Sequence, residues 1–106
     1  MYRVMKRDGM TVEFDVSKIS AAMIKAFEAV NREYHISIIN MLALQVTSDF
    51  TAKIKDGVIA VEDIQDSVEK VLSETGYADV PKAYILYRKQ REKIRNVNSA
   101  LLNYKD

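Results

Sequence analysis

The turn Asp8-Gly9 near the N-terminus constrains the fold of this 106-residue chain more than any other feature. It separates two short runs, residues 2–7 and 12–15, that we predict to be strands. Asp-Gly is a strong hairpin signal because glycine tolerates the positive φ angles that tight turns need. The sequence therefore predicts that the fold starts with a β-hairpin.

The register of this hairpin stays open between two arrangements. Side chains alternate along a strand, so a shift of one residue exchanges the two faces. A two-residue turn groups one set of side chains on a single face: Val4, Lys6, Glu13 and Asp15. A three-residue loop that includes Met10 groups a different set: Val4, Lys6, Val12 and Phe14.

Two helices are predicted to follow the hairpin. Asp15 is a suitable N-cap for the first, whose apolar residues recur at helical spacing between Ile19 and Val30. Residues 31–34 are predicted to be a connection, and Ser37 to cap the second helix. The apolar stripe of that helix ends at Phe50.

A third strand and two more helices complete the predicted order. Residues 58–61 are short and β-branched, which is typical of a strand. A third helix ends near Gly76, and Asp79 is predicted to cap a fourth. The order is ββααβαα, and the predicted fold class is α+β. A small three-stranded sheet over a four-helix bundle buries all the apolar stripes.

Composition excludes several classes of function. The net charge of +1 argues against general affinity for nucleic acid or for an anionic membrane. The chain has no cysteine, which removes disulfides and thiolate metal sites. No apolar run has the length of a membrane span and no signal peptide is recognisable, so the predicted location is the cytoplasm.

Motifs for catalysis are weak. The single histidine, His35, falls in a predicted connection, where a structural or surface role is commoner than a catalytic one. The serines have no recognisable base partner, and no phosphate-binding P-loop motif is present. We therefore predict that the domain itself does no chemistry.

Two charged clusters fit solvated surfaces better than binding sites. Acidic residues gather at the start of the third predicted helix: Glu62, Asp63, Asp66 and Glu69. Basic residues gather in the fourth: Arg88, Lys89, Arg91, Lys93 and Arg95. Acids suit the positive end of the helix dipole and cations its negative end. The residues alone favour a solvated face over a metal site or a nucleic-acid site.

Three other cations are more informative as a set. Lys6 and Arg7 end the first predicted strand, and Lys18 lies in the first turn of the helix that follows the second. Flexible cations and helix-terminal N–H groups are what a triphosphate requires. Val4, Phe14 and Ile19 supply a slot for a base, and Asp15 or Glu13 an acceptor for its exocyclic amine. The alternative, a charged hairpin edge that resists strand addition, is equally consistent with these residues.

Three separated segments resemble one known family. They are "VMKRDGMTVEFDVSKISAAMIKAF", "VIAVEDIQDSVEKVL" and "GYADVPKAYILYRKQREKIR". In this order they resemble the ATP cone, the nucleotide-sensing domain of ribonucleotide reductases, from about residue 2 to 95. The final stretch, "NVNSALLNYKD", resembles the segment after the cone in anaerobic (class III) ribonucleoside-triphosphate reductases.

The resemblance implies a fold and a nucleotide site. The implied fold is a four-helix bundle capped by a three-stranded sheet, with the nucleotide beneath the sheet. Lys6 and Arg7 match the phosphate-binding pair, Lys18 a lysine near ribose and phosphate, and Lys89 a further phosphate-binding cation. The positions that wall the adenine are Val4, Phe14, Ile19 and Ile64. Asp15 matches an adenine-recognising position, and the pairing of Val4 with Phe14 in the wall favours the three-residue loop.

The chain departs from the family pattern at three points. Val12 stands where an acid is frequent, and Glu13 follows one residue later. Ala60 and Val61 stand where the family commonly has a serine or threonine just before the third helix, and Val61 is among the predicted site residues. Gln65 replaces a residue near the sugar that is histidine in some members.

The resemblance also implies a regulatory function. Residues 1–95 are predicted to be an ATP cone that binds ATP or dATP with Mg²⁺, and residues 96–106 a tail or linker. The implied parent is an anaerobic ribonucleotide reductase, and the implied partners are the rest of that enzyme and neighbouring cones in an oligomer. One alternative is the cone of a transcriptional repressor of reductase genes, although a chain without cysteine lacks the zinc ribbon found there. Another is a small helical interaction or nucleic-acid-binding module.

Overall fold

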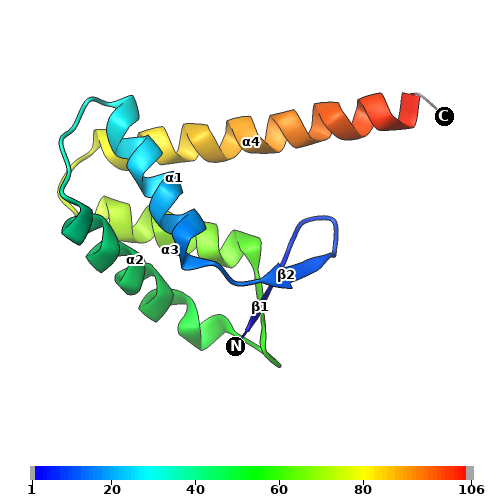
Figure 1. Cartoon of the computed structure of the whole chain (residues 1–106), viewed down its shortest axis with the longest axis horizontal. Coiled ribbons are helices and arrows are strands. Elements are labelled where there is room, and N and C mark those ends of the chain that lie inside the picture. Colours follow the sequence, from blue (N-terminus) through cyan, green and yellow to red (C-terminus); the bar gives the residue numbers. More distant parts are fainter. Residues whose placement is uncertain (1, 105–106) are drawn as a thin grey trace.

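The architecture is a bundle of four helices with a small sheet at one end (Figure 1). The computed structural model describes the backbone of residues 2–104 and the side chains of residues 2–94. The elements in chain order are β1 (Arg3–Met5), β2 (Thr11–Glu13), α1 (Val16–Ala29), α2 (Ile36–Phe50), the 3₁₀ turn η1 (Thr51–Lys53), β3 (Val58–Ala60), α3 (Val61–Ser73) and α4 (Asp79–Tyr104). The predicted ββααβαα order and the α+β class are confirmed.

β1 is the central strand of the sheet, whose order is β2-β1-β3. It pairs antiparallel with β2 and parallel with β3, so that Val4 lies opposite both Val12 and Ile59. The parallel pairing is possible because α1 and α2 return the chain to the same end of the sheet. Val4 and Ile59 are buried against the helices, so one face of the sheet closes the core.

The hairpin loop has three residues, Arg7 to Gly9. The Lys6 amide donates to the Met10 carbonyl at 2.8 Å, and the Gly9 amide to the Lys6 carbonyl at 2.9 Å. Gly9 has a φ of 88°, the positive value that ends such a loop without strain. The predicted loop length and shared face are therefore confirmed, but the prediction that Met10 belongs to the loop is wrong.

Helix starts follow the predictions in part. The Asp15 carboxylate accepts bonds from the Ser17 hydroxyl (2.6 Å) and the Ser17 amide (3.0 Å), which confirms the cap and lowers the pKa of Asp15. The predicted Ser37 cap is wrong. His35 caps α2, because its Nδ1 accepts from the Ser37 amide at 3.2 Å. The third strand ends at Ala60, one residue earlier than predicted, and Asp79 is the first residue of α4.

An aromatic cluster joins the sheet to the bundle. Phe50, at the end of α2, is fully buried and contacts Tyr2 and Phe14 edge-on. The centroid of its ring lies 5.9 Å from that of Tyr2 and 5.6 Å from that of Phe14. Tyr2 and Phe14 lie 4.7 Å apart. Phe14 directly follows the hairpin, so this cluster fixes the hairpin on α2.

A polar link between α2 and α3 gives the first testable prediction. Asp49 accepts from the Ser67 hydroxyl at 2.7 Å and from Lys70 Nζ at 2.8 Å, and Ser67 is only 1% exposed. Asp49→Ala leaves that buried hydroxyl unpaired, which is expected to cost about 1–3 kcal/mol of unfolding free energy at pH 7.

The same link has a pH dependence. Lys70 and Ser67 lower the pKa of Asp49, so its contribution to stability is complete at neutral pH and is lost as pH falls below about 4. Urea unfolding of wild type and Asp49→Ala at pH 7 and pH 3 measures this, with the exposed neighbour Ser48→Ala as control. A difference between the two proteins that did not shrink at pH 3 would contradict the assignment.

The bundle has no candidate for a membrane span among residues 2–104, because none of its helices combines sufficient length with sufficient apolar character. The predicted division at residue 95 stays a prediction. It falls within α4, whose side chains after residue 94, including that of Arg95, lie outside the described residues.

Candidate functional site

A cleft of about 270 Å³ lies beneath the sheet, between the hairpin, the first turns of α1 and α3, and the middle of α4. It brings together every predicted site residue except Arg7 and Lys89. The predicted residues that line it are Val4, Lys6, Phe14, Asp15, Lys18, Ile19, Val61, Ile64 and Gln65. Val12 and Glu13 line it as well. Residues from the two ends of the sequence therefore meet in one concave site.

The inner part of the cleft is apolar. Val4, Ile19 and Ile64 are almost fully buried and come from β1, α1 and α3. Val12 and Phe14 add half-buried side chains from the hairpin. A floor of this kind suits the face of a flat, weakly polar group, because its burial removes apolar surface from water.

The rim of the cleft is charged. Lys6 on the hairpin, Lys18 on α1 and Arg91 on α4 line it and are exposed. Two carboxylates, Glu13 and Asp15, share this rim. Both bonds from Ser17 use Oδ1 of Asp15. The arrangement therefore offers cations for an anionic group and carboxylate acceptors for an N–H donor.

One face of α4 contributes residues that the sequence analysis did not assign to the site. Tyr84, Tyr87, Arg88 and Arg91 all line the cleft. Their spacing of three and four residues places them on one side of a helix. The sequence carries a signal for this face, because positions 84, 87, 88 and 91 follow the spacing of one side of a helix. Burial raises the pKa of Tyr84, which keeps its phenol neutral.

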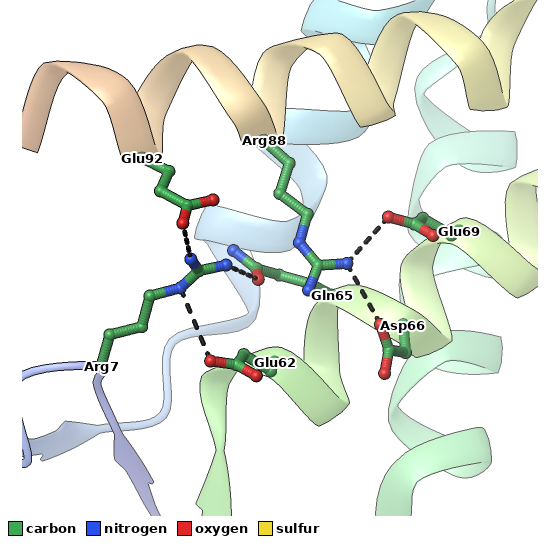
Figure 2. Close-up of polar contacts among 7 residues, drawn as sticks. All are labelled: Arg7, Glu62, Gln65, Asp66, Glu69, Arg88 and Glu92. Carbon is green, nitrogen blue, oxygen red and sulfur yellow. Dashed lines mark hydrogen bonds and ion pairs between the residues drawn. The ribbon is translucent and has the colours of Figure 1, made fainter.

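Arg88 is held by acids of α3. Its Nη1 lies 2.8 Å from Glu69 Oε1 and 3.1 Å from Asp66 Oδ1 (Figure 2). The Arg88 side chain is 18% exposed, so this pair of contacts fixes the guanidinium at the wall of the cleft. Two of the four acids that were predicted to lie on a solvated helix start, Asp66 and Glu69, therefore bind arginine. Among the described residues, no group of three or more His, Cys, Asp or Glu side chains is arranged for a metal ion.

Arg7 lies near the cleft without lining it. Its guanidinium contacts Glu92 on α4 and both Glu62 and Gln65 on α3 (Figure 2). Gln65 itself lines the cleft, so Arg7 is one side chain away from it. The predicted phosphate-binding cation is thus close to the site but engaged with protein acceptors.

Comparison with known proteins identifies the family. The sequence matches the ATP cone domain family over residues 2–93. The chain belongs to the ATP-cone family. In ribonucleotide reductases these domains are generally allosteric regulatory domains.

Several relatives of this ATP cone are ribonucleotide reductases. The chain is 41% identical over 98 residues to the ribonucleoside-diphosphate reductase subunit alpha of Chlamydia pneumoniae, covering 87% of the chain and 9% of the relative. It is 38% identical over 104 residues to the vitamin B12-dependent ribonucleoside-diphosphate reductase of Mycobacterium tuberculosis, covering 98% of the chain and 14% of the relative. The anaerobic ribonucleoside-triphosphate reductase of Haemophilus influenzae is 33% identical over 102 residues, covering 94% and 14%. The chain thus spans 9–14% of the length of these relatives, and the predicted resemblance is confirmed.

Lys89 is the predicted site residue that the structure of this ATP cone places away from the cleft. It is exposed on α4 and does not line the cleft, whereas Arg88 does. Adjacent residues on a helix point about 100° apart, so the neighbour of a lining residue faces elsewhere. The cations that α4 supplies to the cleft are Arg88 and Arg91.

A second hollow of about 380 Å³ lies at the other end of this ATP cone. It is bounded by the connection between α1 and α2, by α2 and by the end of α3, and its charged lining residues are Glu33 and Glu74. No lysine or arginine is among its described lining residues. An anionic ligand is therefore disfavoured there, and the cleft beneath the sheet is the candidate site.

Proposed function

We propose that this ATP cone binds ATP and dATP in the cleft beneath the sheet and thereby regulates the activity of a ribonucleotide reductase. The observation that carries the proposal is the meeting of Lys6, Lys18 and Arg91 around an apolar floor. These cations come from the hairpin, α1 and α4, so the fold gathers them from distant parts of the chain. Burying a base against an apolar surface while cations bind its phosphates is the chemistry of nucleotide recognition.

The adenine fits the apolar floor of Val4, Ile19 and Ile64, beside Phe14. Asp15 retains Oδ2 to accept a hydrogen bond from the exocyclic amine. Guanine has a carbonyl oxygen at the ring position where adenine has its amino group. This oxygen and the Asp15 carboxylate are both acceptors, so no hydrogen bond forms between them. The site therefore favours adenine over guanine.

The triphosphate extends toward the rim. The cleft is slightly smaller than the roughly 300–1,000 Å³ typical of sites that enclose a ligand, so the phosphates lie at its mouth. α3 begins there without a side-chain cap at Ala60, which leaves amides of its first turn available to an anion. Among the described residues, no three His, Cys, Asp or Glu side chains are arranged for a metal ion. Mg²⁺ accompanying the nucleotide would therefore be bound chiefly by phosphate and water.

Regulation requires that the two nucleotides favour different states. A ligand shifts an equilibrium only by its difference in affinity for the two states, so ATP and dATP must act on different conformations or assemblies. The partners that we propose are the remainder of a reductase and neighbouring cones, in the cytoplasm. The reductase relatives support this role over that of a repressor cone. The engagement of Arg88 by Asp66 and Glu69 gives no support to a nucleic-acid-binding helix.

Calorimetric titration with ATP, dATP, GTP and dGTP, each with and without Mg²⁺, tests the proposal. We expect saturable binding of both adenine nucleotides. We expect guanine nucleotides to bind about 10- to 100-fold more weakly, the range that one hydrogen bond to a charged group supports. Binding of no nucleotide by the folded protein, or equal binding of adenine and guanine, would contradict the proposed function.

A further inference from the structure

Arg7, in the hairpin loop, contacts three acceptors of the protein through its guanidinium. Nη1 lies 2.6 Å from Glu92 Oε1, Nη2 lies 3.4 Å from Gln65 Oε1, and Nε lies 3.8 Å from Glu62 Oε1 (Figure 2). Every nitrogen of the guanidinium therefore faces an acceptor on α3 or α4. The shortest contact is the ion pair with Glu92, which joins the hairpin to α4 across 85 positions of the sequence.

This geometry is incompatible with phosphate binding by the same side chain. A guanidinium binds phosphate best through two parallel N–H groups, which requires an open edge of the fork. The Arg7 side chain is 26% exposed and that of Glu92 is 43% exposed, so water and small anions reach the pair. A phosphate that approaches Arg7 must displace a carboxylate, which is also negatively charged.

We propose that Glu92 competes with the phosphates of a bound nucleotide for Arg7, so that binding transfers Arg7 from α4 to the ligand. The proposal rests on the proposed function. Glu92 is then a positioning residue that sets nucleotide affinity without touching the nucleotide. Glu62, whose contact is longer and whose side chain is 59% exposed, is a weaker competitor.

The exchange couples the site to α4. In the free protein the ion pair ties the tip of the hairpin to α4, which extends well past the other helices at its C-terminal end (Figure 1). Nucleotide binding removes this tie. Because coupling between two equilibria is reciprocal, any contact that fixes Glu92 on Arg7 lowers nucleotide affinity, and any contact that draws Glu92 away raises it.

Glu92→Gln tests the competition. Glutamine keeps the shape of the side chain and removes its charge. We expect ATP affinity to rise about two- to fivefold, the range that partly exposed ion pairs are worth. The gain must vanish when Arg7 is already alanine, and Glu92→Asp must restore affinity toward the wild-type value. Inorganic tripolyphosphate as a second probe reports on the phosphates alone.

Asp63→Asn is the matched control. Asp63 lies in the same first turn of α3 as Glu62, makes no ion pair with the described residues, and changes the net charge by the same amount when replaced. We expect a much smaller gain for Asp63→Asn than for Glu92→Gln. Circular dichroism verifies that each variant is folded.

Different results separate the two proposals. Unchanged affinity in Glu92→Gln, an equal gain in Asp63→Asn, or a gain that persists without Arg7 would overturn the competition and leave the proposed function standing. A Glu92-dependent gain for tripolyphosphate, with no preference for adenine, would support the competition and reject the nucleotide sensor. Failure of the wild-type protein to bind any of these probes would reject both.

Discussion

Lys6→Ala combined with Arg7→Ala is expected to weaken ATP binding by at least about 100-fold while leaving the fold intact. Charge-assisted hydrogen bonds contribute about 1.5–3 kcal/mol each, and every 1.4 kcal/mol is a factor of ten in affinity. Lys6 lines the cleft, and under the proposed exchange Arg7 leaves Glu92 and binds the phosphates. Neither residue belongs to the buried core, so neither truncation opens it.

Calorimetry measures this effect, and urea unfolding measures the stability of the same samples. Lys55→Ala combined with Lys82→Ala is the matched control, because it removes two exposed lysines that do not line the cleft. We expect less than a threefold change in that control, since distant exposed charges are screened by salt. Equal loss of affinity in the two double variants would mean that Lys6 and Arg7 act only through the overall charge of the protein. Unchanged affinity in Lys6→Ala combined with Arg7→Ala would remove both residues from the site.

Local signals were sufficient to predict the order of the elements. The hairpin follows from Asp8-Gly9, and the start of α1 from Asp15, because both depend on hydrogen bonds between residues close in sequence. The cap of α2 also depends on a local hydrogen bond, but its residue was predicted wrongly. Serine is a commoner cap than histidine, yet the extended backbone at His35 places its ring beside the Ser37 amide.

The φ angle of Gly9 helps to decide which three residues form the hairpin loop. Gly9 takes the positive φ at the last loop position, and the Asp8 carboxylate accepts from the Met10 amide at 2.9 Å. Met10 therefore lies just after the loop and not within it. Both candidate loops of three residues present the same face of the hairpin, so the predicted neighbours Val4 and Phe14 were correct although the loop was misplaced.

The charged part of the site could be predicted less well than its apolar part. Apolar periodicity shows which side of a helix is buried, and it predicted Ile19, whereas Ile64 was implied by the resemblance to the ATP cone; both are buried. Charged residues have no such period. The partners of Arg7 and Arg88 lie on other elements, and only the packing of the hairpin, α3 and α4 against one another shows which acid each arginine meets. Sequence spacing alone could not exclude Lys89 or establish the Glu92 contact.

Phe50→Ala is expected to have the largest effect on stability, a loss of about 3–5 kcal/mol of unfolding free energy. Phe50 is completely buried, and its ring is the part of α2 that contacts Tyr2 and Phe14. A domain of this size has a total of only about 5–15 kcal/mol, so the variant is expected to unfold at low urea concentration.

Leu44→Ala is the control on the same helix. Leu44 is 68% exposed, so its truncation is expected to cost less than about 0.5 kcal/mol. Because Phe14 lines the cleft and packs on Phe50, any folded fraction of Phe50→Ala should also bind ATP more weakly. A cost for Phe50→Ala no greater than that for Leu44→Ala would mean that the aromatic cluster does not hold the hairpin on α2. The rigid wall that the proposed adenine site requires would then lack its support.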